Sequence, residues 1–279
     1  MFPPWHVRLF ALLLLVFSAP GYSAEAGTVH PYLSENFFVD VGIFFPNRTF
    51  GVAVDGSLGD DHDLIEFEES IELKEKDRIL ALEFGWRFGD KWRLVGQYFE
   101  SKGGGSAILE EDIEWADVVF QAGTNAAGGA SLTLIRAFFG REFRSGKMHE
   151  FGFGAGFHWL EIGAFIEGTI LVEGGETAAA AESVHAQAPL PNIGVWYNYS
   201  ITERWALRAR ADIFSAEIDR YDGTMLNLAL GVDYQIAANF GVGLNYNYFD
   251  IDVKIDQSDW RGRIITSHEG LYLNLSFYW

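Results

Sequence analysis

Alternation of apolar and polar residues is the dominant pattern in this chain of 279 residues, and it is strictest in the last ten. One face of that segment is apolar and carries Leu271, Leu273, Leu275, Phe277 and Trp279. The residues between them are small or have a polar tip: Gly270, Tyr272, Asn274, Ser276 and Tyr278. Successive side chains of a β-strand point to opposite faces, so a period of two residues predicts a strand. Its apolar face needs an apolar medium outside it, which indicates lipid.

Nine earlier segments alternate in the same way, and together with the last they predict an all-β protein. The expected strands are residues 37–45, 80–88, 92–98, 135–143, 151–159, 193–199, 205–213, 226–234, 240–248 and 270–279. Beyond the amino terminus, no apolar run reaches the roughly 20 residues that a membrane helix needs. A membrane protein without such helices satisfies its backbone hydrogen bonds only in a closed barrel. The prediction is a closed antiparallel transmembrane β-barrel of about ten strands with long extracellular loops; eight and twelve strands are the alternatives.

Short turns and long connections alternate between these segments, as they do in membrane barrels. Tight turns are predicted at residues 89–91, 144–147, 201–204 and 237–239. The other connections are placed outside the cell, at residues 46–78, 101–129, 162–188, 219–223 and 252–267. The first of them still alternates in part, which predicts a hairpin above the membrane; two additional barrel strands are the alternative. The alanine-rich third connection is expected to be a mobile loop.

The amino terminus has the features of an export signal. His6 and Arg8 precede an apolar run at residues 9–17, and Ala24 and Ala26 are small residues at the two positions that determine cleavage. The run is about half as long as a membrane-spanning helix. We therefore expect residues 1–26 to be a signal peptide and residues 27–279 to form one barrel domain, with cleavage after Ser23 or Ala24 as alternatives.

Composition and charge narrow the range of functions. The 39 acidic residues outnumber the 20 basic ones, for a net charge of -19. Nucleic acid is therefore not an expected partner, because phosphates require a basic surface. The chain has no Cys, which removes disulfides, redox chemistry and thiolate metal sites. Acidic runs such as residues 60–63 offer oxygen ligands, but none has the spacing of a calcium loop, so only diffuse binding of divalent cations is expected there.

The same alternation assigns a second set of side chains to the lumen, and many of them are charged. This predicted lumen charge network consists of Asp40, Glu83, Arg87, Arg93, Arg136, Glu142, Glu150, Arg208, Arg210, Asp212 and Asp233. Five of these residues are basic and six are acidic. Unpaired buried charges are costly, so near balance predicts that they pair across the lumen as a structural plug. A selective aqueous path lined by the same charges is the alternative. Arg208, Arg210 and Asp212 lie on one strand and Asp233 on the next, which predicts a network between these strands if the register allows it.

The closing strand of a chain that begins with an export signal resembles the closing strand of bacterial outer-membrane β-barrels. The chain is similar in general character to the OmpA, OmpW and opacity-type barrels of Gram-negative bacteria. The resemblance implies an outer-membrane location with both termini periplasmic, and contact with outer-membrane lipid and lipopolysaccharide. It also implies that the barrel-assembly machinery is a partner during biogenesis. The candidate assembly signal consists of Tyr272, Phe277 and Trp279.

Candidate catalytic groups are few, so we expect a protein that is not an enzyme and has no cofactor and no specific metal site. Ser267, His268 and Glu269 adjoin, but neighbours on a strand point to opposite faces, which disfavours a catalytic triad. The ten-stranded omptin proteases resemble the chain in predicted strand number. Their site uses aspartates and a histidine, and the Asp-His-Asp run at residues 61–63 contains the same residue types. The first expectation is a structural or surface-interaction role with acidic extracellular loops. The alternatives are a narrow channel for small or hydrophobic solutes and, after it, a lipid-modifying or omptin-like enzyme.

Overall fold

The fold is seen in a computed structural model of the chain. It describes residues 29–54, 65–66, 74–75, 78–89, 91–110, 112–115, 118–171, 177–218, 221–256 and 261–279. The expected signal peptide at residues 1–26 and the acidic run at residues 60–63 lie outside these ranges. The elements are α2 (Pro31–Ser34), β1 (Phe37–Val54), β2 (Ile65–Glu66), β3 (Lys74–Glu75), β4 (Ile79–Phe88), β5 (Trp92–Ile108), β6 (Ile113–Trp115), β7 (Val118–Phe120), β8 (Asn125–Ser145), β9 (His149–Leu171), β10 (Thr177–Ser200), β11 (Trp205–Ile218), β12 (Tyr221–Ala237), β13 (Phe240–Asp256) and β14 (Arg261–Tyr278).

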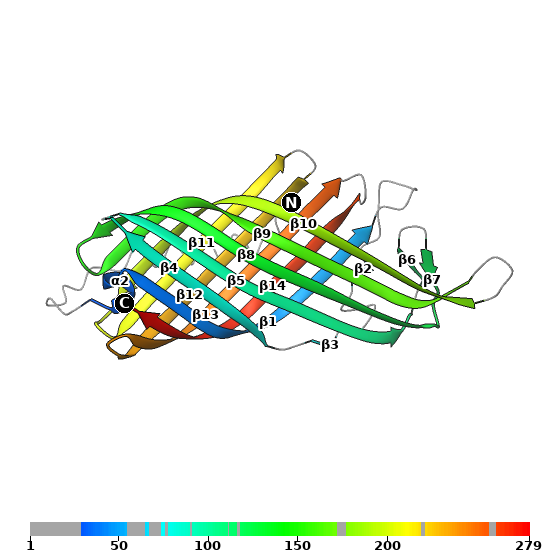
Figure 1. Ribbon diagram of the computed structural model, residues 1–279, viewed down its shortest axis with the longest axis horizontal. Helices are drawn as coiled ribbons and strands as arrows, with labels where there is room; N and C mark the ends of the chain where they lie inside the picture. Colours follow the sequence, from blue (N-terminus) through cyan, green and yellow to red (C-terminus); the bar gives the residue numbers. More distant parts are fainter. Residues whose placement is uncertain are drawn as a thin grey trace.

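Ten long strands form a closed antiparallel barrel, as the sequence predicts. Each pairs with its neighbours in the order β1, β4, β5, β8, β9, β10, β11, β12, β13, β14. The ring closes between the first and the last strand, where Val41 lies opposite Leu275 in a ladder that runs from Phe38 to Val54. Figure 1 shows the strands tilted along the barrel, with α2 and the carboxyl terminus together at one end. We call this the α2 end and the opposite one the far end.

The four tight turns all lie at the α2 end, and each lies within two residues of its predicted position; β8 continues to Ser145 and β12 to Ala237, where the sequence predicted turn. They join β4 to β5, β8 to β9, β10 to β11 and β12 to β13. Gly89 and Gly146 adopt φ angles of 51° and 68° in the first two turns, a conformation that residues with a Cβ rarely adopt. The sequence pattern therefore predicted, to within about two residues, where the barrel strands begin or end at the α2 end.

At the far end the strands are longer than predicted. The expected mobile loop at residues 162–188 is wrong: β9 and β10 pair continuously from Thr177 opposite Leu171 down to Tyr199 opposite His149. The physical reason is that this segment buries Val184, Ala186 and Ala188 inside the barrel. The sequence did not show it, because an alanine run has no alternation of apolar and polar residues. Parts of the other predicted loops are also strand, and β6 and β7 form a small hairpin whose Phe120 pairs with Ile170 of β9. The predicted hairpin in residues 46–78 is described only in part, where β1 continues to Val54 and pairs with β2.

An apolar belt surrounds the barrel near the α2 end. The side chains assigned to lipid by the sequence are exposed, for example Phe84, Phe153 and Leu275 at 48%, 53% and 46%. Within the described part of the chain, no helix is long and apolar enough to cross a membrane. Rings stack along the edge of the belt and form what we call the aromatic girdle: Phe37, Trp86, Phe88, Trp92, Phe139, Phe143, Phe153, Trp205, Tyr234, Phe240, Phe277 and Trp279. Such a girdle marks the level of a membrane interface.

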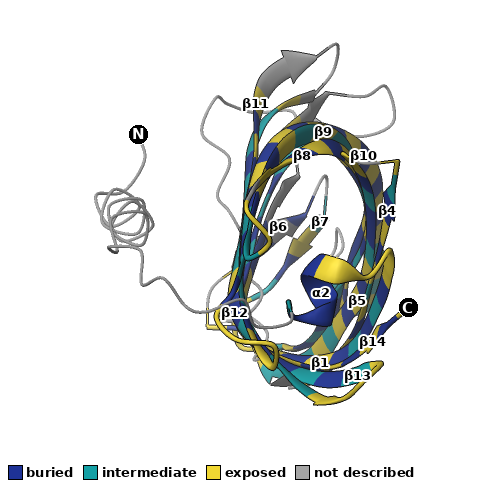
Figure 2. Cartoon of the chain, turned by 90° about the vertical axis from the view of Figure 1, so that its left-hand side faces the viewer, coloured by how far each residue is buried: buried dark blue, intermediate teal, exposed yellow. Residues whose placement is uncertain are grey.

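The interior changes character along the barrel axis. On β9 the inward residues are Glu, Gly or His up to His158, and they are apolar at Leu160. The outward residues are apolar from Phe151 to Trp159, while Glu161 and Glu167 face outward beyond it. Beyond the belt the outer face meets water, so apolar burial inside is favourable there. At the belt the outer medium is itself apolar, and polar contacts inside hold the strands together instead. Figure 2 looks along the barrel from the α2 end and shows an oval ring with α2 inside its opening.

Candidate functional site

The structure places all eleven residues of the predicted lumen charge network on the inner face of the barrel. Two groups can be distinguished by their contacts. The α2-side cluster consists of Arg87, Arg93, Glu142 and Glu150, together with Arg144, which the sequence analysis did not include. The cross-lumen cluster consists of Asp40, Glu83, Arg136, Arg208, Arg210, Asp212 and Asp233.

Glu150 is the centre of the α2-side cluster. Its carboxylate, fully buried, accepts hydrogen bonds from Arg87 Nη2 at 2.5 Å and Arg93 Nη1 at 2.6 Å. Trp196 Nε1 and Asn198 Nδ2 donate to it at 2.9 and 2.8 Å. These donors come from β4, β5 and β10, so one carboxylate of β9 ties strands from both sides of it. Charge-assisted hydrogen bonds in such dry surroundings are strong and cannot be replaced by water.

Glu142 completes this cluster. It accepts a hydrogen bond from Arg87 Nε at 2.8 Å and another from Arg144 Nε at 2.9 Å. Arg144 is exposed at the α2 end and also approaches Glu150, with Nη2 at 3.6 Å from the carboxylate. Arg144 was missed because the predicted turn at residues 144–147 included it, whereas β8 continues to Ser145.

The cross-lumen cluster bridges opposite walls of the barrel. Arg208 of β11 donates to Asp40 of β1 at 2.7 Å and to Glu83 of β4 at 2.8 Å. It also donates to Asp233 on the neighbouring strand at 3.4 Å, the contact between these strands that the sequence suggested. Three carboxylates thus surround one guanidinium. The contacts of Arg208 with Asp40 and Glu83 reach across the lumen. The sequence did not predict them, because these residues do not lie on strands adjacent to β11.

The other half of the cross-lumen cluster joins β8 to β11. Arg136 Nη2 donates to Asp212 Oδ1 at 2.9 Å, and both side chains are almost fully buried. Arg210 connects the halves, since its Nη1 donates to Glu83 at 3.4 Å and its Nε lies 3.7 Å from Asp212. The network therefore spans the lumen from β8 through β11 to β4 and β1.

A short helix, α2, lies inside the α2 end of the barrel and was not anticipated from the sequence. The phenol of Tyr32 accepts a hydrogen bond from Arg93, and its ring lies under Arg208, whose Cζ is 4.0 Å from the ring centroid. Arg87 donates to two backbone carbonyls, those of Glu35 at 2.5 Å and of Tyr32 at 3.3 Å. Arginines of both clusters therefore hold α2, and Tyr32 connects them. No sequence signal marks this role, because a four-residue helix is too short to show periodicity.

His30 caps α2 as a neutral side chain. Its Nδ1 accepts a hydrogen bond from the backbone N–H of Tyr32 at 3.2 Å, and its own backbone N–H donates to Ser200 Oγ at 3.0 Å. Burial lowers the pKa of His30 to about 4, and the positive charge of Arg208 adds to that effect. A neutral imidazole keeps a lone pair for the cap, which a protonated one would lack.

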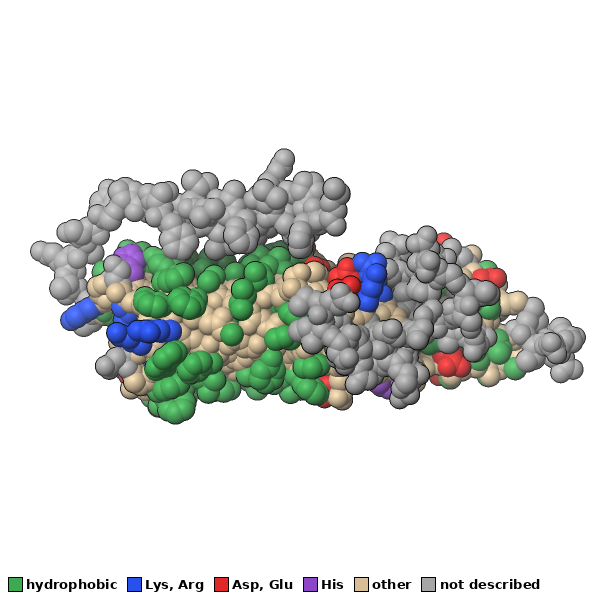
Figure 3. All heavy atoms as spheres, turned by 90° about the horizontal axis from the view of Figure 1, so that it is seen from above, with side chains coloured by type: hydrophobic (Ala, Val, Ile, Leu, Met, Phe, Trp, Pro, Cys, Tyr) green, Lys and Arg blue, Asp and Glu red, His purple; other side chains and the backbone are tan. Residues whose placement is uncertain are grey.

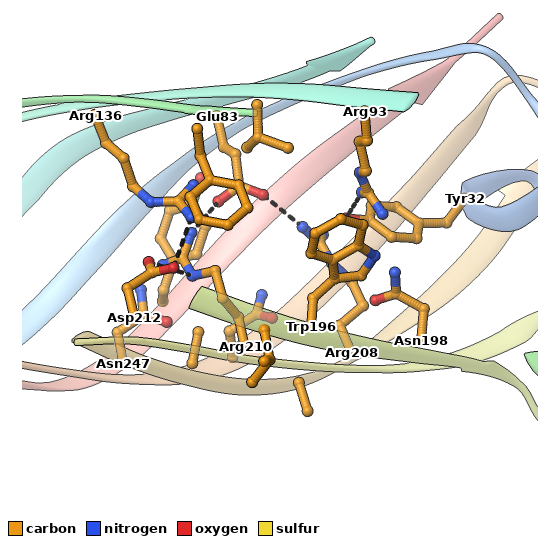
Figure 4. Close-up of a pocket in the computed structure, with 17 residues that line it drawn as sticks. Tyr32, Glu83, Arg93, Arg136, Trp196, Asn198, Arg208, Arg210, Asp212 and Asn247 are labelled. Carbon is orange, nitrogen blue, oxygen red and sulfur yellow. Dashed lines mark hydrogen bonds and ion pairs between the residues drawn. The ribbon is translucent and has the colours of Figure 1, made fainter. Parts of the chain in front are cut away.

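A cavity of about 60 Å³ lies between the two clusters. Figure 4 shows Arg136, Arg210 and Asp212 at one end of it and Tyr32, Arg93 and Asn198 at the other. One water molecule needs roughly 10–15 Å³ of such space, so the cavity has room for a few. Nε and Nη1 of Arg136 have no hydrogen-bond partner within the described part of the protein, and this residue lines the cavity. Charged and polar side chains of both clusters border this cavity, together with apolar ones such as Val95 and Phe138.

Beyond the cross-lumen cluster, apolar side chains fill the interior of the barrel. A continuous core there includes Phe44, Phe99, Trp115, Phe120, Leu132, Leu134, Leu160, Ile162, Ile166, Leu190, Phe214, Phe249 and Ile251. Trp115 and Phe120 belong to the β6 and β7 hairpin, so this hairpin contributes to the same core. The lumen is thus occupied at two levels, by ion pairs at the belt and by a packed apolar core beyond it.

The candidate catalytic groups do not come together in the described residues. His268 is buried and faces the ring of Phe99, whereas Ser267 bonds Thr49 at 2.8 Å and Glu269 accepts a hydrogen bond from Tyr246. No group of three or more His, Cys, Asp or Glu side chains in the described ranges is arranged to hold a metal ion. The Asp-His-Asp run at residues 61–63 lies outside those ranges.

The three residues of the candidate assembly signal do not share a face. Phe277 and Trp279 point outward at the aromatic girdle, where Trp279 stacks on Phe37 with ring centroids 5.9 Å apart. Tyr272 is buried inside, and its hydroxyl donates to the backbone carbonyl of Ala81 at 3.3 Å. This follows from their spacing, because odd and even positions of β14 face opposite ways.

Comparison with known proteins supports the fold. No protein-family model matches the chain, and no curated protein matches it either. Among solved structures, the outer membrane protease OmpT from Escherichia coli is similar with a TM-score of 0.60 at 10% identity, over 92% of this chain and 99% of that one. The toluene transporter TodX of P. putida (TM-score 0.33, 10% identity, 88% and 90% coverage) and Neisserial surface protein A (0.29, 13%, 87% and 97%) are also found. The chain thus has the fold of small outer-membrane β-barrels.

The comparison with OmpT corrects one expectation. The sequence analysis predicted that the chain is not an enzyme. This prediction is wrong, because a barrel of the same architecture is a protease and an enzymatic role is therefore possible. At 10% identity the likeness shows the fold and carries no residue roles from OmpT to this chain. The fold shared with OmpT therefore leaves an enzymatic role open without assigning one.

Proposed function

We propose that this protein is an integral barrel of the bacterial outer membrane that acts at the cell surface through its far end, while its lumen remains closed. The observation that carries the proposal is the double filling of the lumen. Buried ion pairs and α2 occupy it at the level of the belt, and the apolar core occupies it beyond. Barrels of about eight to ten strands have little interior space once side chains fill it.

The far end supports a surface role because part of the barrel wall projects well beyond the belt. Strands β8, β9 and β10 have 21, 23 and 24 residues, against the 9–11 or so that cross a bilayer. Figure 1 shows these strands reaching furthest from the α2 end. The apolar core inside this projecting wall gives it the stability of a water-soluble domain, so it can present its outer face rigidly to a partner.

The proposed orientation puts the α2 end and both termini in the periplasm and the projecting wall outside. Short turns at one end and long connections at the other support it, since membrane barrels have short periplasmic turns. Lipopolysaccharide and divalent cations are the partners proposed for the outer end, and the assembly machinery is the partner proposed for biogenesis. A narrow channel is the second candidate, because polar residues line a chamber at the belt.

A closed lumen predicts that the protein conducts no ions. The refolded protein in planar lipid bilayers is expected to show no steady single-channel conductance. The Arg208→Ala/Arg210→Ala variant is expected to be silent too, because the apolar core beyond these residues remains in place. Insertion of each protein is verified separately by its resistance to added protease. Steady conductance of the wild-type protein would contradict the closed-lumen proposal, and a change of that conductance in the variant would favour the channel.

The orientation predicts which single cysteines are accessible from outside, and the absence of native Cys makes the labelling clean. Ser183 of β10 is exposed on the projecting wall, and Ala238 is exposed in the turn between β12 and β13. A Ser183→Cys variant should react with a membrane-impermeant maleimide on intact cells. An Ala238→Cys variant should react only after the outer membrane is permeabilised. The reverse pattern would overturn the proposed orientation, and equal labelling of both in intact cells would also count against it.

A further inference from the structure

The rim of the barrel at the α2 end carries an uneven distribution of positive charge. Lys91 lies in the turn between β4 and β5, Lys147 in the turn between β8 and β9, and Arg141 near the end of β8. These two turns are neighbours on the rim, because β5 pairs with β8. The β12 to β13 turn consists of Ala238 and Asn239 and carries no charge. In a chain with a net charge of -19, three cations on one arc of the rim form a local positive patch, which we call the basic rim patch.

Arg141 is the residue that joins this patch to the belt. It is exposed on the outer face of β8, opposite Trp92 on one side and Phe153 on the other. Its Cζ lies 5.8 Å from the centroid of the Trp92 ring and 5.5 Å from that of Phe143. A guanidinium held over rings of the aromatic girdle sits at the depth where lipid headgroups begin.

The cations of the basic rim patch differ from the arginines of the lumen. Arg144, near the end of β8, forms ion pairs with Glu142 and Glu150. By contrast, no carboxylate in the described ranges forms an ion pair with Arg141, Lys91 or Lys147. Figure 3 shows Lys and Arg side chains at the α2 end next to hydrophobic ones, with acidic side chains farther along the molecule.

We propose that the basic rim patch binds the phosphate headgroup of an anionic phospholipid. Arg141, with five donors in a planar fork, contacts the phosphate, and Lys91 and Lys147 supply additional positive charge. The acyl chains lie against the exposed rings of Phe139, Phe143 and Phe153 just inside the belt. This apolar surface directly beside the cations favours a lipid over a soluble phosphate, because it stabilises only a ligand with a hydrocarbon portion.

The test compares lipid binding by the full-length protein and by two variants matched in charge. The purified protein in neutral detergent is incubated with phosphatidylglycerol and phosphatidylcholine of identical acyl chains, and retained lipid is counted by native mass spectrometry. The wild-type protein should retain phosphatidylglycerol in preference to phosphatidylcholine. The Arg141→Gln variant should lose about fivefold of that preference, the effect of one cation near an anionic lipid surface. The Arg204→Gln variant should keep it, since the guanidinium of Arg204, an exposed rim cation, donates to Tyr234 of β12, three strands along the rim from β9.

Three outcomes would overturn the proposal. No preference in the wild-type protein would show that the patch does not select anionic lipid. An equal loss in the Arg141→Gln and Arg204→Gln variants would show a general effect of net charge rather than a site. Displacement of the lipid by excess inorganic phosphate would show that the patch recognises free phosphate and that the apolar surface contributes nothing. Arg141 is exposed, so its replacement is expected to leave the barrel folded, and an unchanged thermal unfolding curve verifies this.

Discussion

Replacing Glu150 with Gln is expected to destabilise the barrel by about 3–5 kcal/mol, because it removes one partner of a buried ion-pair cluster. Arg87 and Arg93 would then remain buried with only Glu142 left to pair with Arg87, and no carboxylate left for Arg93. An amide also presents an N–H₂ group where every group that now bonds the carboxylate is a donor. The loss is therefore expected to exceed that of an ordinary hydrogen bond, which is about 1 kcal/mol.

The measurement is urea unfolding of the protein in lipid vesicles, followed by tryptophan fluorescence. Glu167→Gln is the matched control, because Glu167 lies on the same strand and is exposed beyond the belt. It should change the unfolding free energy by no more than about 0.5 kcal/mol, as most surface substitutions do. If both variants unfold at the same urea concentration, Glu150 is not the structural centre of the α2-side cluster.

Replacing Arg208 with Met should destabilise the barrel by a similar amount, about 3–5 kcal/mol, and should also loosen α2. Asp40, Glu83 and Asp233 would lose the guanidinium that they share, and three buried carboxylates would face one another. Met keeps much of the aliphatic length of Arg, so the loss reflects charge more than volume. Tyr32 would also lose the cation above its ring.

Two readouts separate these effects. Urea unfolding reports the global loss, and amide hydrogen exchange of Tyr32 and Leu33 reports the release of α2, which should become faster. An added Asp40→Asn substitution should recover part of the stability, because it removes one of the uncompensated charges. The control is Arg263→Met, since Arg263 pairs with Asp252 at 2.6 Å on an exposed site. Exposed pairs contribute only about 0–1 kcal/mol, so equal losses in Arg208→Met and Arg263→Met would contradict the network.

The two-level interior explains why these predictions concern ion pairs. In a water-soluble barrel, apolar side chains inside and polar ones outside would be the stable arrangement. At the belt the barrel is surrounded by lipid, which is as apolar as an apolar interior. Moving apolar side chains inward would therefore bring no gain in free energy. Polar contacts such as Arg136 with Asp212 then hold the walls together. Beyond the belt water surrounds the wall, and Leu160 and Leu190 form an ordinary core.

Much of the barrel could be predicted from the sequence because its controlling rule is local. Side chains alternate between two faces, so the pattern from Phe151 to Trp159 or from Leu271 to Trp279 reports which face meets lipid, without knowledge of any partner strand. The same rule placed Glu150 and Arg208 in the lumen, and Gly89 and Gly146 in turns. The count of alternating segments predicted about ten strands, and closure of the barrel followed from the need to satisfy every backbone hydrogen bond in lipid.

Only the tertiary structure decided which lumen charges meet. Arg208 and Asp40 are 168 residues apart in the chain, and Arg136 and Asp212 are 76 apart. Such contacts depend on barrel width, strand tilt and register together, and no local period encodes these. The role of Tyr32 in α2 is of the same kind, since its partners Arg93 and Arg208 come from opposite walls. The strand in residues 177–188 was hidden for a related reason: alanine is small enough for either face, so its burial is determined by what packs against it.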